Sequence, residues 1–172
     1  GSGDYFSVAD HVIQLADYRA SDVTRKAHEI SHNTSSYRAS EGGGEFGKIR
    51  SRIPVAASFD PYRGNRRVKV ASKGLNEIVF GRTAIDLMDV EQLVDISQTN
   101  AIAQAIYYAT RYMDGKRCLK EVVTMVIDDV KEQGLDVLVS HPVGNLAFFR
   151  ALDLAAAINR MRTLSIKDKD GP

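Results

Sequence analysis

The run His28-Glu29-Ile30-Ser31-His32 has the spacing of a zinc-dependent hydrolase site. On a helix, the two imidazoles lie one turn apart on the same face and can bind one zinc ion, while the glutamate activates a metal-bound water. A third ligand would have to be Glu41 or Glu45, both in a glycine-rich stretch, and the helix is expected to end close to His32. We therefore expect no metal at His28 and His32, and keep a zinc metallopeptidase as the alternative function.

The segment from Arg50 to Lys73 is strongly basic. It holds seven positive residues and one acid, with Phe59 and Tyr62 among them. Cationic and aromatic side chains on strands and turns suit phosphate contacts and base stacking, so the segment predicts binding of RNA or another single-stranded nucleic acid. Binding would require the cations to converge on one face around the turn at residues 60–65. The candidate nucleic-acid-binding residues are Arg50, Arg52, Arg63, Arg66, Arg67 and Lys69. The alternative is that these cations form the solvated face of a strand.

Residues 86–136 balance this charge with ten acids against five bases, and the net charge of the whole chain is +1. The acidic stretch could pair with the basic segment within the chain or across a homodimer. Asp86, Asp89, Glu91 and Asp95 could suggest a metal site, but acids that precede an apolar run are typical of helix amino ends, where they complement the helix dipole. We interpret them in that way, and assign no catalytic residue.

The pattern of apolar residues predicts the elements that must position these side chains. A strand is expected at 10–16, followed by a helix that Ser21 or Asp22 caps and that runs to about residue 30. Residues 33–47 read as a linker, residues 48–58 as an extended segment, and residues 66–87 as a small antiparallel sheet. Apolar residues at helical spacing predict three helices, at about 99–113, 118–133 and 146–164. The expected fold class is α+β.

Composition is ordinary for a soluble globular protein, with 44% hydrophobic and 26% charged residues in 172. No apolar stretch approaches the roughly eighteen residues of a membrane span, so no membrane partner is expected. The single cysteine, Cys118, excludes an internal disulfide and fits a reducing compartment, with the cytoplasm expected. Because it stands where a helix should begin, Cys118 is expected to be a small core residue.

Five stretches in combination resemble the predicted ATPases of the ABC class. They are DYFSVADHVIQLADYRASDVT at 4–24, FDPYRGNRRVKVASKGLNEIVFG at 59–81, IDLMDVEQLVDISQTNAIAQAI at 85–106, RYMDGKRCLKEVV at 111–123 and ALDLAAAINRMRTLSI at 151–166. The resemblance implies that residues 1–58 are the C-terminal remnant of an ABC-type nucleotide-binding domain, the strand-helix-strand edge of a P-loop ATPase. It implies that residues 59–172 are an appended α+β C-terminal domain with a helical hairpin.

The same resemblance implies ATP and Mg as cofactors of the parent protein, with the upstream part of the same ATPase as a partner. Ser2 would then stand in the switch loop near the γ-phosphate. This sequence departs from the family because it has no G-x-x-x-x-G-K-[ST] motif, whose backbone amides and lysine hold the phosphates. We therefore expect that the chain alone binds no cofactor and does not hydrolyse ATP. Its expected role is that of an interaction module for nucleic acid or a second subunit.

Overall fold

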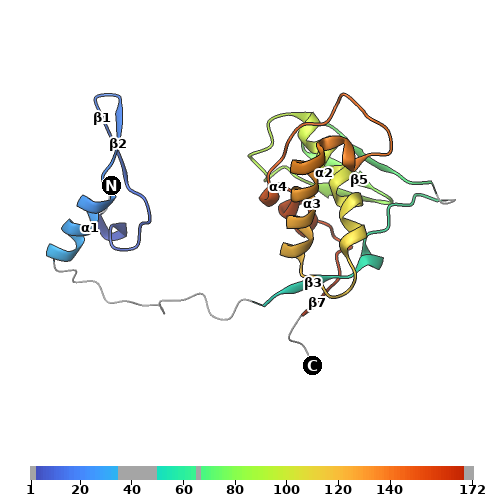
Figure 1. The fold of residues 1–172 in the computed structure, drawn as a ribbon, viewed down its shortest axis with the longest axis horizontal. Coiled ribbons are helices and arrows are strands. Elements are labelled where there is room, and N and C mark those ends of the chain that lie inside the picture. The colour runs from blue at the N-terminus through green and yellow to red at the C-terminus, as the bar shows by residue number, and fades with distance from the viewer. Residues whose placement is uncertain (1–2, 35–49, 65–66, 169–172) are drawn as a thin grey trace. The chain divides into compact units, whose positions relative to one another are not determined.

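The structure, a computed structural model, describes residues 3–34, 50–64 and 67–168. The chain forms two compact units, residues 1–47 and 48–172 (Figure 1). The boundary between the units lies earlier than the expected division after residue 58. The reason is that strand β3 (Arg52–Pro54) pairs antiparallel with strand β7 (Ile166–Asp168), so the segment around residue 53 belongs to the C-terminal unit. Small antiparallel sheets and several helices confirm the mixed α and β fold class.

The N-terminal unit consists of a hairpin and a helix. Its elements are η1 (Gly3–Tyr5), β1 (Ile13–Ala16), β2 (Arg19–Asp22) and α1 (Thr24–Asn33). The expected strand and helix are both present, but the sequence reasoning missed β2 and placed the helix cap within it. Ser21 instead pairs with Gln14 across the hairpin, and the side chain of Asp22 accepts a hydrogen bond of 2.9 Å from the Thr24 amide. The N-terminal unit is therefore a hairpin followed by a helix, and the strand that comes after this helix, β3, pairs within the C-terminal unit.

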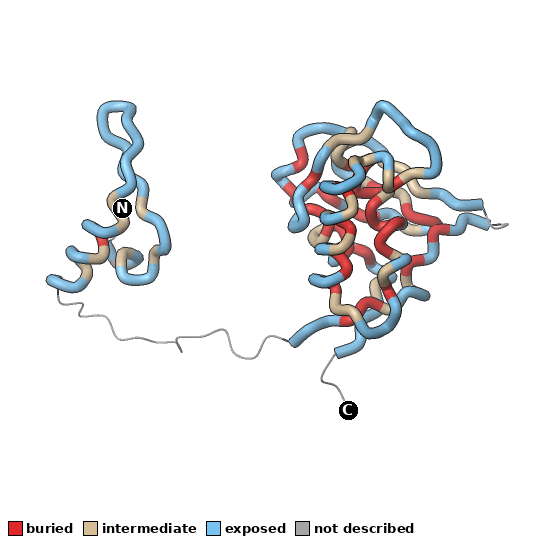
Figure 2. Tube along the Cα trace, in the orientation of Figure 1, coloured by how far each residue is buried: buried red, intermediate tan, exposed pale blue. Residues whose placement is uncertain are grey.

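The hairpin and helix leave most of their apolar side chains uncovered. Ala27 is the one buried hydrophobic residue among those described in this unit, whereas Ile13 and Leu15 are 62% and 72% exposed (Figure 2). A hollow of about 450 Å³ is lined by Val12, Ile13, Val23, Ala27 and Ile30 together with Phe6, Gln14 and Lys26. Burial of apolar surface is the main stabilising contribution to folding. Because this unit buries so little apolar surface, it gains little stability from its own contacts.

A three-stranded antiparallel sheet opens the main part of the C-terminal unit, as predicted. Its strands are β4 (Val70–Ser72), β5 (Glu77–Phe80) and β6 (Thr83–Asp86), in the order β4-β5-β6. Ile78 and Ile85 lie opposite each other across β5 and β6, and both are fully buried. Along β5 and β6, buried residues alternate with more exposed ones, so one face of the sheet is turned toward the helices.

The helices of this unit are α2 (Ile96–Ala109), α3 (Leu119–Gln133) and α4 (Ala151–Asn159). Short 3-10 turns also occur, η2 (Ala56–Ser58), η3 (Thr110–Tyr112) and η4 (Leu135–Leu138). The first two helices agree with the prediction, and Asp95 caps α2 by accepting a 2.7 Å hydrogen bond from the Ser97 amide. The last helix is shorter than predicted because its capping box is formed by Arg150 and Asp153, and Ala147 instead donates its amide to Ser97.

Two tyrosines and an aspartate join α2 and η3 to α3. The hydroxyl groups of Tyr108 and Tyr112 both donate to the Asp129 carboxylate, at 2.9 Å for Tyr108. The hydrogen bond to Asp129, helped by burial, raises the pKa of Tyr112. Asp129 is half-buried and accepts both of these hydrogen bonds. Cys118 was expected in the core, but it is half-exposed at the amino end of α3, where its amide donates a 2.7 Å hydrogen bond to the Glu121 carboxylate.

Candidate nucleic-acid interface

Two extended segments, residues 60–64 and 67–69, run antiparallel and form what we call the basic arm. Tyr62 pairs with Val68, the Arg63 amide donates to the Arg67 carbonyl at 2.9 Å, and the Lys69 amide donates to the Pro61 carbonyl at 2.8 Å. At its start, the Asp60 side chain accepts a 3.0 Å hydrogen bond from the Tyr62 amide. This turn chemistry is what Asp60-Pro61 at the start of the turn predicts.

Gly81, at the turn between β5 and β6, supports the base of the basic arm. Its amide donates to the Lys69 carbonyl at 2.7 Å, and its φ of +60° lies in the left-handed region. A Cβ atom at this position would overlap the carbonyl oxygen of Asp60 and lie 3.2 Å from atoms of Pro61 and Tyr62. Only glycine combines this backbone conformation with so close an approach.

Three exposed cations, Arg63, Arg67 and Lys69, belong to the basic arm, and a fourth, Arg82, follows the turn at its base. Within the described part of the chain, the side chains of these four residues form no ion pair or hydrogen bond. Arg82 follows Gly81 directly and is a candidate that the sequence analysis did not name. Tyr62 lies among these cations with 43% of its surface exposed. The arrangement offers positive charge and one accessible aromatic ring at a single end of the unit.

Phe59, in contrast, cannot act as a stacking platform for a base. Phe59 was expected beside Tyr62 on the binding surface, but only 3% of it is exposed and it belongs to the hydrophobic core. An aromatic ring that stacks on a base must present one free face. The role expected for Phe59 is therefore wrong, and its contribution is to packing.

Arg50 and Arg52 lie at another edge of the unit. Arg52 is the first residue of β3, and Arg50 forms an ion pair of 3.5 Å with Asp168 of β7. In Figure 1, β3 and β7 lie at the lower edge of this unit, whereas the segments on either side of residues 65–66 project from its right-hand side. The described candidates therefore form two groups, contrary to the single face expected. Arg66 and Ser2 fall outside the described residues.

The histidine motif lies on α1, and no third ligand for it occurs among the residues that the structure describes. Nε2 of His28 is 2.9 Å from the carbonyl oxygen of Ala9, so this nitrogen faces an acceptor and is not free for a metal. Glu29 forms an exposed ion pair of 3.6 Å with Arg25. Among the described residues, no group of three histidine, cysteine or acidic side chains could hold a metal ion. The expected ligands Glu41 and Glu45 lie outside those residues.

We expect metal analysis of the chain, purified without chelators, to find no stoichiometric zinc. A structural or catalytic zinc site needs at least three protein ligands with supporting hydrogen bonds. The matched control is the His32→Ala variant, which should contain the same trace of zinc as the wild type. One zinc ion per chain that disappears in His32→Ala would contradict this expectation and favour a metallopeptidase.

Comparison with known families defines the class of the protein. Residues 1–52 match the P-loop domain of the ABC ATPases, so the chain contains part of an ABC-class ATPase. Residues 69–167 match the MRB1590 C-terminal domain, and the chain belongs to that family. No match was found to a curated protein. The helices of the described ranges include none with the length and hydrophobicity that a membrane span requires.

Proposed function

We propose that the C-terminal unit is the nucleic-acid-binding module of an ABC-class ATPase, and that the basic arm binds single-stranded RNA. The observation that supports this most directly is the group of exposed cations around Tyr62. None of these cations forms an ion pair with a carboxylate of a described residue. They are Arg63, Arg67, Lys69 and Arg82. Unpaired cations beside an exposed aromatic ring are the two elements by which proteins hold a single strand without reading its sequence.

The attraction must be local. The net charge of +1 gives the chain no long-range attraction for a polyanion, and the acids between residues 86 and 136 repel phosphates. An arm that projects its cations from one edge places them where a backbone can reach several at once. Stacking of one base on Tyr62 would add roughly 1–3 kcal/mol without sequence preference.

We expect Arg63→Ala/Arg67→Ala to weaken the binding of a labelled oligouridine by about tenfold at low salt. Each lost phosphate contact should also flatten the plot of log affinity against log salt by about 0.7. Fluorescence anisotropy over a salt series measures both quantities. Lys116→Ala/Lys131→Ala, which removes two exposed cations from the helical part, is the matched control and should bind as the wild type does.

Two results would argue against the proposal. Equal affinity of the Arg63→Ala/Arg67→Ala variant and the wild type would remove the basic arm from the site. If that variant instead changes the sedimentation of the chain and leaves RNA binding intact, the arm contacts the acidic stretch of a second copy. Arg50→Ala/Arg52→Ala tests whether the other basic edge takes part in the same binding.

We further propose that the apolar surface of the N-terminal unit packs against the rest of a P-loop domain, the partner expected from the resemblance. The uncovered side chains of Ile13 and Leu15 support this. The ABC-class P-loop domain uses ATP and Mg. The 172 residues contain no phosphate-loop motif, so the groups that hold the phosphates would belong to that partner. The role of Ser2 in a switch loop stays part of this proposal.

A further inference from the structure

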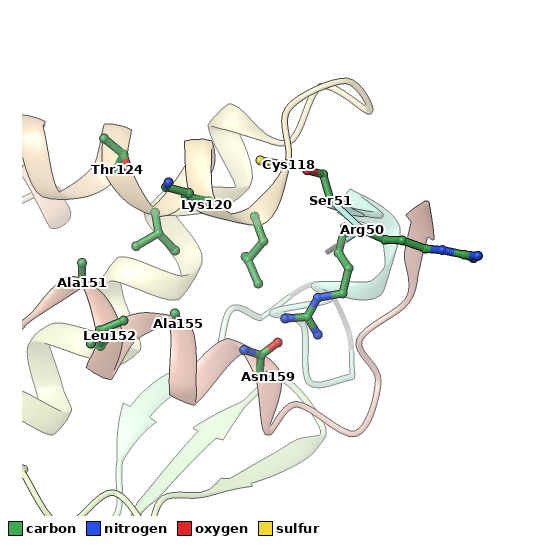
Figure 3. Close-up of a pocket in the computed structure, with 12 residues that line it drawn as sticks. Arg50, Ser51, Cys118, Lys120, Thr124, Ala151, Leu152, Ala155 and Asn159 are labelled. Atoms are coloured by element: carbon green, nitrogen blue, oxygen red, sulfur yellow. The ribbon is translucent and has the colours of Figure 1, made fainter. Parts of the chain in front are cut away.

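A groove runs between α3, α4 and the start of β3, at the edge of the C-terminal unit away from the basic arm. Its volume is about 450 Å³. Figure 3 shows Lys120 and Thr124 of α3 along one side and Ala151, Leu152, Ala155 and Asn159 of α4 along the other. The described residues that line it also include Leu119, Val123, Cys118, Arg50, Ser51 and Arg52.

The floor of the groove is aliphatic and partly open to solvent. Leu119 and Val123 of α3 are buried beneath it, and Ala155 of α4 is half-buried. Leu152 lies on the same side of α4, one turn before Ala155, and 76% of its surface is exposed. Ala155 is small, so the floor beside the larger Leu152 leaves room for a side chain from outside. The lining residues of α4 are spaced one helical turn apart, so they lie on one face of this helix.

The rim of the groove is positively charged. Among the described residues that line it are Arg50, Arg52 and Lys120, and none of these described residues is an acid. Arg50 is held by Asp168, whereas the side chains of Arg52 and Lys120 form no ion pair or hydrogen bond with any residue that the structure describes. An occupant with carboxylates beside an apolar stripe would cover the floor and neutralise both cations.

We propose that this groove binds a short amphipathic helix of a partner protein, with leucine-like residues at i, i+3 and i+4 spacing and acidic residues beside them. Apolar anchors in a groove between two helices are a recurrent mode of peptide recognition. The charge of Arg52 and Lys120 selects an acidic partner over a basic one. The part of the lining that the structure describes contains no aromatic side chain, whereas a site built to stack bases needs one. The proposal does not depend on RNA binding by the basic arm.

The probe for this proposal is a fluorescent, hydrocarbon-stapled helical peptide with a leucine stripe flanked by glutamates. Two control peptides have the same length, one with the leucines scattered and one with lysine in place of glutamate. We expect the acidic amphipathic peptide to bind the full chain, and both control peptides to bind at least about tenfold more weakly. Anisotropy titration measures each dissociation constant.

Variants of exposed residues test the position of the site without threatening the fold. Lys120→Glu should weaken binding by about tenfold and Leu152→Ala by about fivefold. Their controls are Lys131→Glu, further along α3, and Val94→Ala, another exposed aliphatic residue, and neither should change the dissociation constant. Circular dichroism melts confirm that all four variants are folded.

Several outcomes would overturn the proposal. Binding that Lys120→Glu and Leu152→Ala leave unchanged would place the peptide elsewhere. Displacement of the peptide by oligouridine from a site that Lys120→Glu weakens would make the groove a nucleic-acid site. Self-association that Leu152→Ala abolishes, without peptide binding, would assign the groove to a second copy of the chain.

Discussion

Replacing Gly81 by alanine is expected to destabilise the C-terminal unit by about 3 kcal/mol, the largest effect we expect of any single substitution. Part of the loss is conformational, because φ of +60° strains any residue with a side chain. The larger part is steric, because the added methyl group would overlap the Asp60 carbonyl oxygen and push the base of the basic arm away from the sheet. Chemical denaturation followed by circular dichroism measures the change in the free energy of unfolding.

Gly74→Ala is the matched control. Its φ of +72° is similar, but a Cβ atom there would meet no atom within 4 Å. This variant should lose only the conformational part, about 1 kcal/mol. Equal losses in the two variants would show that the contact between Gly81 and the arm contributes nothing. Because the arm moves when Gly81 changes, Gly81→Ala should also weaken oligouridine binding, whereas Gly74→Ala should not.

The local pattern of the sequence predicted the helices of the C-terminal unit best. Periodic apolar residues such as Ile102, Ile106, Val122 and Val126 identify α2 and α3, and all four are fully buried. The predicted ends of the helices were less accurate, because each helix cap depends on a few single contacts. The last helix begins at Ala151 rather than near 146, since the Asp153 side chain returns to Arg150 and the preceding residues follow the amino end of α2.

The parts that could not be predicted depend on contacts between distant segments. The pairing of Ile53 with Lys167 draws β3 into the C-terminal unit, and nothing in the residues around 53 indicates that partner. For the same reason the basic residues divide into two groups, although they are close in sequence. Phe59 resembles an exposed aromatic of a basic loop, but the fold buries it. The groove beside α4 joins three segments and has no local signature at all.

Backbone amides of the N-terminal unit are expected to exchange with solvent at least about 1000-fold faster than those in α2 and α3. A two-stranded hairpin is at best marginally stable alone, and β1 and β2 have all their described residues exposed. Helix α1 adds one buried residue, Ala27, whereas α2 and α3 share a continuous core. Hydrogen exchange measured by mass spectrometry compares the peptides from residues 13–33 with those from 96–133.

The same measurement separates an intrinsically unstable unit from one that lacks its packing partner. If the apolar surface around Ile13 and Leu15 belongs against the rest of a P-loop domain, fusion to such a domain should slow exchange in β1, β2 and α1 and leave α2 and α3 unchanged. Protection that is already uniform across both units of the chain alone would refute this view of the N-terminal unit. Exchange that stays fast after fusion would mean that its uncovered side chains face a different partner. In each case α3 serves as the internal reference, because its buried face, formed by Val122, Val126 and Val130, is complete within the C-terminal unit.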